Sequence, residues 1–90
     1  MRTEQLRCAL ERAQAVLRQW NAEHPDRVLP WEWLEEALLA RRAWRLGARR
    51  ARALRMAARE RFHEFARRLP PGLVQHAMGR RWRAAPGSQR

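Results

Sequence analysis

The longest helical pattern in the chain spans residues 30–69, PWEWLEEALLARRAWRLGARRARALRMAARERFHEFARRL. Its apolar and small residues recur at alternating steps of four and three, which is typical of one buried face of an α-helix. The positions on this face are Trp33, Ala37, Ala40, Trp44, Gly47, Ala51, Leu54, Ala58, Phe62, Phe65 and Leu69. One additional four-residue step precedes Phe62, as in a coiled-coil stutter. The pattern predicts a single long helix.

Gly47 is the position at which the predicted helix could be interrupted. Two separate helices meeting there would normally shift the phase of the apolar pattern, and the phase does not change at Gly47. Glycine inside a helix is less favourable than alanine by roughly 1 kcal/mol. We therefore expect one helix over residues 30–69, straight or kinked at Gly47. A tight helix–turn–helix at Gly47 is the alternative.

Two shorter helices are expected on either side of the long one. Residues 3–22 carry an apolar helical stripe that should stop before Pro25. Pro70-Pro71-Gly72 ends the long helix, residues 72–82 are expected to form a short last helix, and residues 84–90 a disordered tail. The sequence predicts an all-α fold: a small bundle of three helices in one domain over residues 1–83, packed as antiparallel hairpins around the long central helix.

Charge is strongly segregated along the chain. Residues 1–40 hold five arginines and seven acidic residues, whereas residues 41–90 hold fifteen arginines and two glutamates. All twenty basic residues are arginine. Arginine codons are favoured by GC-rich coding, which explains the absence of lysine but not the clustering. A guanidinium group binds phosphate in a bidentate manner and stacks on bases, so this surface suits a polyanionic partner.

The strongest candidate site is an arginine stripe within the long helix. Between Arg41 and Arg59 there are eight arginines and no acidic residue. On a continuous helix six of them share one face about 27 Å long, namely Arg41, Arg45, Arg49, Arg52, Arg55 and Arg59. The alternative is a solvated face whose charges are balanced by acids on another helix. We expect contact with a phosphate backbone, without a base-reading code.

A second candidate lies near the C-terminus, in Gly79-Arg80-Arg81-Trp82-Arg83. Arg80, Arg81 and Arg83 can hold phosphates while Trp82 stacks on an unpaired base. The alternative is that Trp82 anchors the last helix to the core. The other four tryptophans occupy helix-periodic apolar positions and are expected in the core, with a base-stacking platform as a remote alternative.

Residues for catalysis or metal binding are scarce. His63 lies between Glu60 and Glu64, where a solvated polar face is expected rather than acid–base chemistry. The single cysteine, Cys8, has no histidine at ligand spacing, and the chain carries no glycine-rich phosphate loop. We expect no enzymatic activity, no cofactor and no metal.

These patterns predict a nucleic-acid-binding protein, with RNA or single-stranded DNA favoured, acting alone or as a small subunit of a larger nucleoprotein complex. The alternative is a protein-interaction module, an adaptor or a mobile-element-encoded inhibitor, whose basic face docks on an acidic partner protein. The 33–69 apolar seam is longer than residues 3–22 can cover, which also suggests a protein partner or a homodimer. With no signal-like or membrane-length apolar run, we expect a cytoplasmic protein without membrane attachment.

Overall fold

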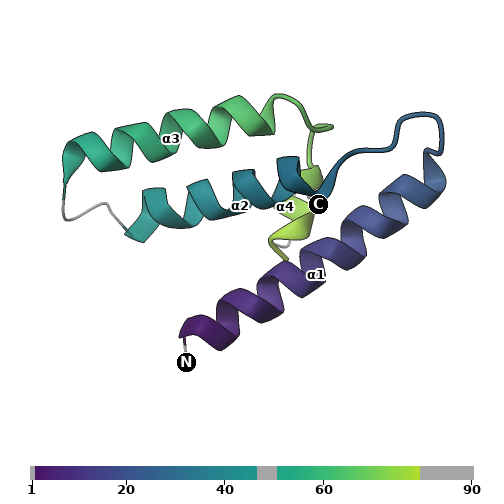
Figure 1. Ribbon diagram of the computed structural model, residues 1–90, viewed down its shortest axis with the longest axis horizontal. Helices are drawn as coiled ribbons and strands as arrows, with labels where there is room; N and C mark the ends of the chain where they lie inside the picture. The colour runs from purple at the N-terminus through teal and green to yellow at the C-terminus, as the bar shows by residue number, and fades with distance from the viewer. Residues whose placement is uncertain (1, 47–50, 80–90) are drawn as a thin grey trace, which may run out of the picture. The chain divides into compact units, whose positions relative to one another are not determined.

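The computed structural model describes residues 2–46 and 51–79, and over these ranges it contains four α-helices and no strand (Figure 1). The helices are α1 (Arg2–Glu23), α2 (Trp31–Leu46), α3 (Arg52–Ala66) and α4 (Leu73–Ala77). The predicted all-α class is confirmed. The chain divides into two compact units, one of Met1–Leu29 with Pro71–Arg90 and one of Pro30–Pro70. A single domain over residues 1–83 stays a prediction, and the predicted tail at residues 84–90 lies outside the described residues.

The continuous helix predicted over residues 30–69 is wrong, because this segment folds into a helical hairpin. α2 ends at Leu46 and α3 begins at Arg52, and the backbone of Ala51 is extended, with φ −133° and ψ 118°. The two helices pack side by side in opposite directions (Figure 1). A continuous helix gives its apolar face no partner within the segment, whereas the hairpin buries the α2 half against the α3 half. The predicted kink at Gly47 lies outside the described residues.

The packing face of α3 differs from the predicted seam at one position. Leu54 was expected on the seam, yet 70% of its surface is exposed. Arg55 is half-buried in its place. With this exchange the steps of four and three alternate without a stutter, and the face consists of Ala51, Arg55, Ala58, Phe62, Phe65 and Leu69. Because the seam is folded on itself, its length is no longer a reason to expect a second copy of the chain.

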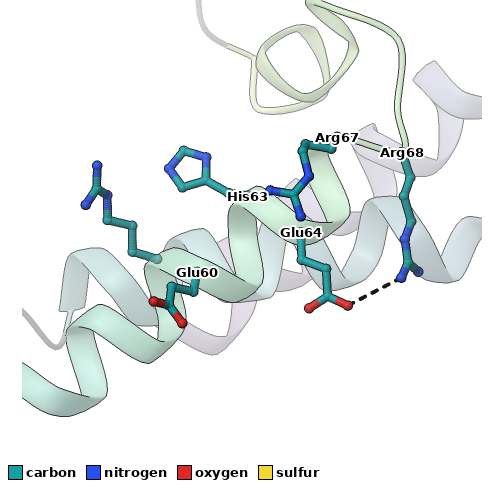
Figure 2. A pocket seen from close by; sticks show the side chains of 6 residues that line it. Glu60, His63, Glu64, Arg67 and Arg68 are labelled. Carbon is teal, nitrogen blue, oxygen red and sulfur yellow. Dashed lines mark hydrogen bonds and ion pairs between the residues drawn. The ribbon is translucent and has the colours of Figure 1, made fainter.

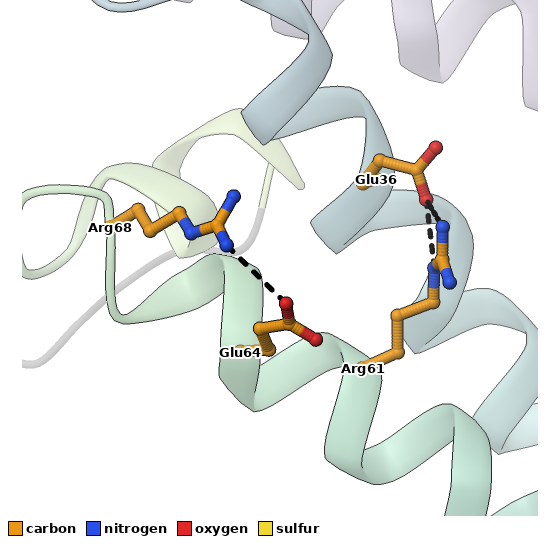
Figure 3. Close-up of polar contacts among 4 residues, drawn as sticks. All are labelled: Glu36, Arg61, Glu64 and Arg68. Carbon is orange, nitrogen blue, oxygen red and sulfur yellow. Dashed lines mark hydrogen bonds and ion pairs between the residues drawn. The ribbon is translucent and has the colours of Figure 1, made fainter.

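An ion pair joins the two helices of the hairpin. Arg61 on α3 donates from Nε and Nη2 to Oε1 of Glu36 on α2, at 2.9 and 2.8 Å (Figure 3). The Arg61 side chain is 57% exposed and that of Glu36 35% exposed. An ion pair at this exposure contributes about 0–1 kcal/mol. Leu34, Ala37 and Ala40 of α2 are buried and account for more of the packing.

The other unit pairs the long α1 with the short α4. α1 confirms the helix predicted over residues 3–22 to within one residue at each end. The connection after α1 is held by the Asn21 side chain, whose Nδ2 donates to Leu29 O and whose Oδ1 accepts from Leu29 N. The two helices are in contact, and their buried residues are Ala13 and Leu17 of α1 and Leu73, Val74 and Ala77 of α4.

The last helix is shorter than the predicted 72–82. α4 ends at Ala77, and Gly79 has a φ of +73°, a value that favours glycine and stops a right-handed helix. The backbone N–H groups of Met78 and Gly79 donate to Val74 O and His76 O, which satisfies two of the four carbonyl groups at the helix end. Residues 80–82 lie outside the described part of the chain.

Candidate nucleic-acid interface

The hairpin divides the predicted arginine stripe between two helices. Arg41 and Arg45 lie on α2, and Arg52, Arg55 and Arg59 lie on α3. The prediction of one straight stripe about 27 Å long is therefore wrong, because it required a continuous helix. The remaining predicted site residues lie outside the described ranges: Arg49, Arg80, Arg81 and Arg83.

Two ring contacts nevertheless place arginines from both helices on one flank of the hairpin. The guanidinium carbon of Arg41 lies 5.8 Å from the ring centre of Phe62 on α3. That of Arg59 lies 5.8 Å from the ring centre of Trp44 on α2. Arg52 and Arg59 are almost two helical turns apart, so they project from the same side of α3 about 10 Å apart along its axis. We use the name basic flank for the arginines of the predicted stripe that lie within the described ranges: Arg41, Arg45, Arg52, Arg55 and Arg59.

The three exposed arginines of the basic flank have no carboxylate partner among the described residues. All nine acidic residues lie within the described ranges. The ion pairs they form there are Glu4–Arg7, Glu11–Arg7, Glu36–Arg61 and Glu64–Arg68. None of them involves Arg45, Arg52 or Arg59, whose side chains are exposed. These three cations therefore face solvent without a counter-charge from the described residues.

Arg55 differs from the other arginines of the flank. It is half-buried on the α3 packing face, and its Nε is enclosed with no hydrogen-bond partner among the described residues. An unsatisfied buried donor costs roughly 1–3 kcal/mol. Its aliphatic stem covers apolar surface, as the stem of a partly buried arginine commonly does. Arg55 is therefore less available to a ligand than the sequence indicated.

An aromatic cluster lies beside the basic flank. The ring of Trp44 is 6.0 Å from that of Phe62 and 6.1 Å from that of His63. The rings of Phe62 and His63 meet edge to face at 5.3 Å. Trp44 is half-buried rather than buried, so the expectation of a core tryptophan is met only in part. The apolar periodicity could not reveal that this ring would lie beside arginines of both helices.

The opposite flank carries a similar cluster whose charges are balanced. The guanidinium carbon of Arg68 lies 4.7 Å from the ring centre of Phe65 and 5.7 Å from that of Trp33. Arg68 also pairs with Glu64 at 3.3 Å, and Figure 3 shows this pair together with Glu36–Arg61. A polyanion approaching this side therefore meets carboxylates as well as arginines.

A shallow, open hollow of about 790 Å³ runs along α3 and the turn after it (Figure 2). It is lined by Arg59, Glu60, His63, Glu64, Arg67 and Arg68. The exposed side chain of His63 and the alternating charges agree with the expected solvated polar face. No cluster of three or more metal-ligating side chains occurs in the described ranges. None of the described helices has the length and apolar character required to cross a membrane.

Comparison with protein-family profiles, with characterised proteins and with solved structures finds no match to the chain.

Proposed function

We propose that the protein binds nucleic acid through the basic flank of the α2–α3 hairpin, with RNA or single-stranded DNA favoured. The observation that supports this most strongly is that Arg45, Arg52 and Arg59 form no ion pair with a carboxylate in the described part of the chain. Like charges held on one small surface repel one another, and phosphates relieve that repulsion while releasing counter-ions from the nucleic acid. The binding is a property of the backbone charge and carries no base code.

The size of the interface follows from the hairpin. Arg52 and Arg59 lie about 10 Å apart on α3, and Arg45 lies one turn beyond Arg41 on α2. This surface spans a few phosphates, fewer than the six of a continuous stripe. A module of this size acts alone with modest affinity or as a small subunit of a larger nucleoprotein complex. An exposed free thiol at Cys8 is compatible with a reducing cytoplasm, the compartment we propose.

Fluorescence anisotropy with labelled single-stranded RNA, single-stranded DNA and duplex DNA tests the proposal. Replacing Arg45, Arg52 and Arg59 together with glutamine removes three exposed cations. At about 0.5–1 kcal/mol for each exposed ion pair, the triple variant should lose about 10- to 150-fold in affinity for every ligand. Unchanged binding would exclude the basic flank as the contact surface.

A matched control keeps the net charge equal. Replacing Arg7, Arg18 and Arg27 with glutamine removes the same three charges from exposed positions of the other unit. The affinity of this control for nucleic acid should fall by less than about threefold, which is the effect expected from the change in net charge alone at physiological ionic strength. Equal losses in the two triple variants would show that overall charge, rather than the flank, controls binding.

The second candidate function is the protein-interaction module, an adaptor or inhibitor that docks on an acidic partner. It is favoured by two exposed leucines at the ends of α2 and α3 nearest their connection, because Leu46 is 55% and Leu54 70% exposed. Apolar side chains beside arginines suit an acidic protein surface. A stable complex that resists nuclease and loses affinity in the Leu46→Ser, Leu54→Ser variant would support this function in place of nucleic-acid binding.

A further inference from the structure

Trp44 occupies a position on the hairpin that packing alone does not explain. Its ring is half-buried, and guanidinium carbons from both helices lie near it: Arg41 at 5.7 Å and Arg59 at 5.8 Å from the ring centre. Phe62 and His63 border the same ring. A flat aromatic surface is thereby placed between cations that belong to the proposed phosphate-binding flank.

Trp33 offers an internal comparison on the same hairpin. It is also half-buried, and its ring centre lies 5.7 Å from the guanidinium carbon of Arg68. Arg68, however, is paired with Glu64. The two tryptophan rings lie at similar distances from a guanidinium carbon, 5.8 Å for Trp44 and 5.7 Å for Trp33. They differ in whether a carboxylate pairs with that guanidinium. Of these two tryptophans, Trp44 is the one beside an exposed cation, Arg59, that forms no ion pair among the described residues. Trp20 of the other unit also lies near such a cation, Arg27 at 6.0 Å, but its ring is already stacked on His24.

We infer that Trp44 and Arg59 form a stacking site for one unpaired nucleobase of a single strand, while the neighbouring arginines hold its phosphates. This inference rests on the proposed function and specifies its ligand. Aromatic rings and guanidinium planes both stack on bases, and a base inside a duplex does not present its face. RNA and DNA share this chemistry, because every base has a π-face.

The spacing requires only a small movement of one side chain. A base stacked between the indole and a guanidinium needs about 6.8 Å, twice the rise of about 3.4 Å between stacked bases. The Arg59 guanidinium carbon is 5.8 Å from the ring centre, so it must move outward by at least about 1 Å. Arg59 is exposed, so its side chain can rotate without disturbing the hairpin.

The test compares two strands with equal numbers of phosphates against the unmodified full-length protein. One is an oligothymidylate and the other a strand of the same length whose sugars carry no bases. Oligouridylate provides the RNA arm. Anisotropy titrations at one salt concentration should show the base-bearing strands binding at least about fivefold more tightly than the abasic strand. Equal affinity for the strands would overturn the stacking site and leave phosphate binding intact. Failure of every strand to bind would overturn the proposed function and the stacking site with it.

Two tryptophan variants then locate the site. Trp44→Leu should reduce the preference for the base-bearing strands to less than twofold while retaining affinity for the abasic strand. Trp33→Leu, the matched control, should retain the full preference. If Trp44→Leu keeps the preference of the unmodified protein, the base stacks elsewhere and the inference is wrong. The comparison of strands on the unmodified protein remains decisive even where a variant does not fold.

Discussion

Replacing Leu54 with alanine tests which residues of α3 form its packing face. If the apolar seam ran through Leu54, its truncation would remove a buried side chain and cost about 2–5 kcal/mol. In the structure Leu54 is 70% exposed. Only a minor part of its surface leaves water on folding, and full burial of a leucine is worth about 1.5–3 kcal/mol. Alanine is also the best helix former, which offsets part of the loss. The expected change in the free energy of unfolding is within about 0.5 kcal/mol.

Leu34→Ala provides the matched comparison, with the same substitution at a side chain that is 0% exposed. We expect it to lower the free energy of unfolding by about 2–5 kcal/mol. In a chain of this size each kcal/mol corresponds to about 4–8 °C, so Tm should fall by at least about 8 °C. Far-UV circular dichroism during urea and thermal unfolding measures both variants. A Leu54→Ala variant that loses 2 kcal/mol or more would contradict the register of α3.

Three further experiments test individual features of the hairpin. Arg55→Met should raise the free energy of unfolding by about 1–2 kcal/mol, because it keeps an aliphatic stem and removes a buried donor without a partner; a lower Tm would show that the guanidinium is satisfied. A double-mutant cycle of Glu36→Gln and Arg61→Gln, measured by urea unfolding, should give a coupling of about 0.2–1 kcal/mol, and a value above about 2 kcal/mol would mean that the pair fixes the hairpin. Arg52→Glu should stabilise α3 by about 0.3–1 kcal/mol, because no acidic residue lies in its first turn. The same variant should weaken nucleic-acid binding. A lower Tm in thermal unfolding would contradict the expected stabilisation of α3.

Local signals in the sequence determine several boundaries of the fold. Pro25 and the apolar stripe before it predict α1 to within a residue at each end. Pro70-Pro71-Gly72 marks the end of the segment that contains α3, and Gly72 adopts a φ of +85° before α4. In each case the backbone chemistry of proline or glycine acts within a few residues, so no knowledge of distant contacts is needed.

The break between α2 and α3 could not be predicted in the same way. The apolar phase is unchanged across Gly47, so periodicity is equally compatible with a continuous helix and with a hairpin. The choice depends on whether the two halves bury more surface against each other than a single helix buries in its surroundings, which is a tertiary effect. The exchange of Leu54 for Arg55 on the packing face has the same origin. Hydropathy favours the leucine, whereas regular four- and three-residue steps from Ala51 to Leu69 favour the arginine.

The sequence predicts which residues could form the candidate site but not how they are arranged in space. The clustering of arginines and the scarcity of nearby acids are properties of the sequence, and within residues 2–46 and 51–79 no ion pair involves Arg45, Arg52 or Arg59. The meeting of Arg41 and Arg59 at Trp44 depends on the hairpin. Arg41 and Arg59 are 18 positions apart in the sequence, and they approach the same ring only because the chain reverses between α2 and α3.

The dependence of binding on salt concentration tests the central claim most directly, because it counts the ions released when arginines meet phosphates. For a single strand, each neutralised phosphate contributes about −0.7 to the slope of log affinity against log salt concentration. Substituting glutamine for Arg45, Arg52 and Arg59 should therefore make the slope shallower by about 2, while the control variant at Arg7, Arg18 and Arg27 keeps the original slope. An identical slope in the unmodified protein and the Arg45, Arg52, Arg59 variant would contradict the claim that these unpaired arginines bind a polyanion.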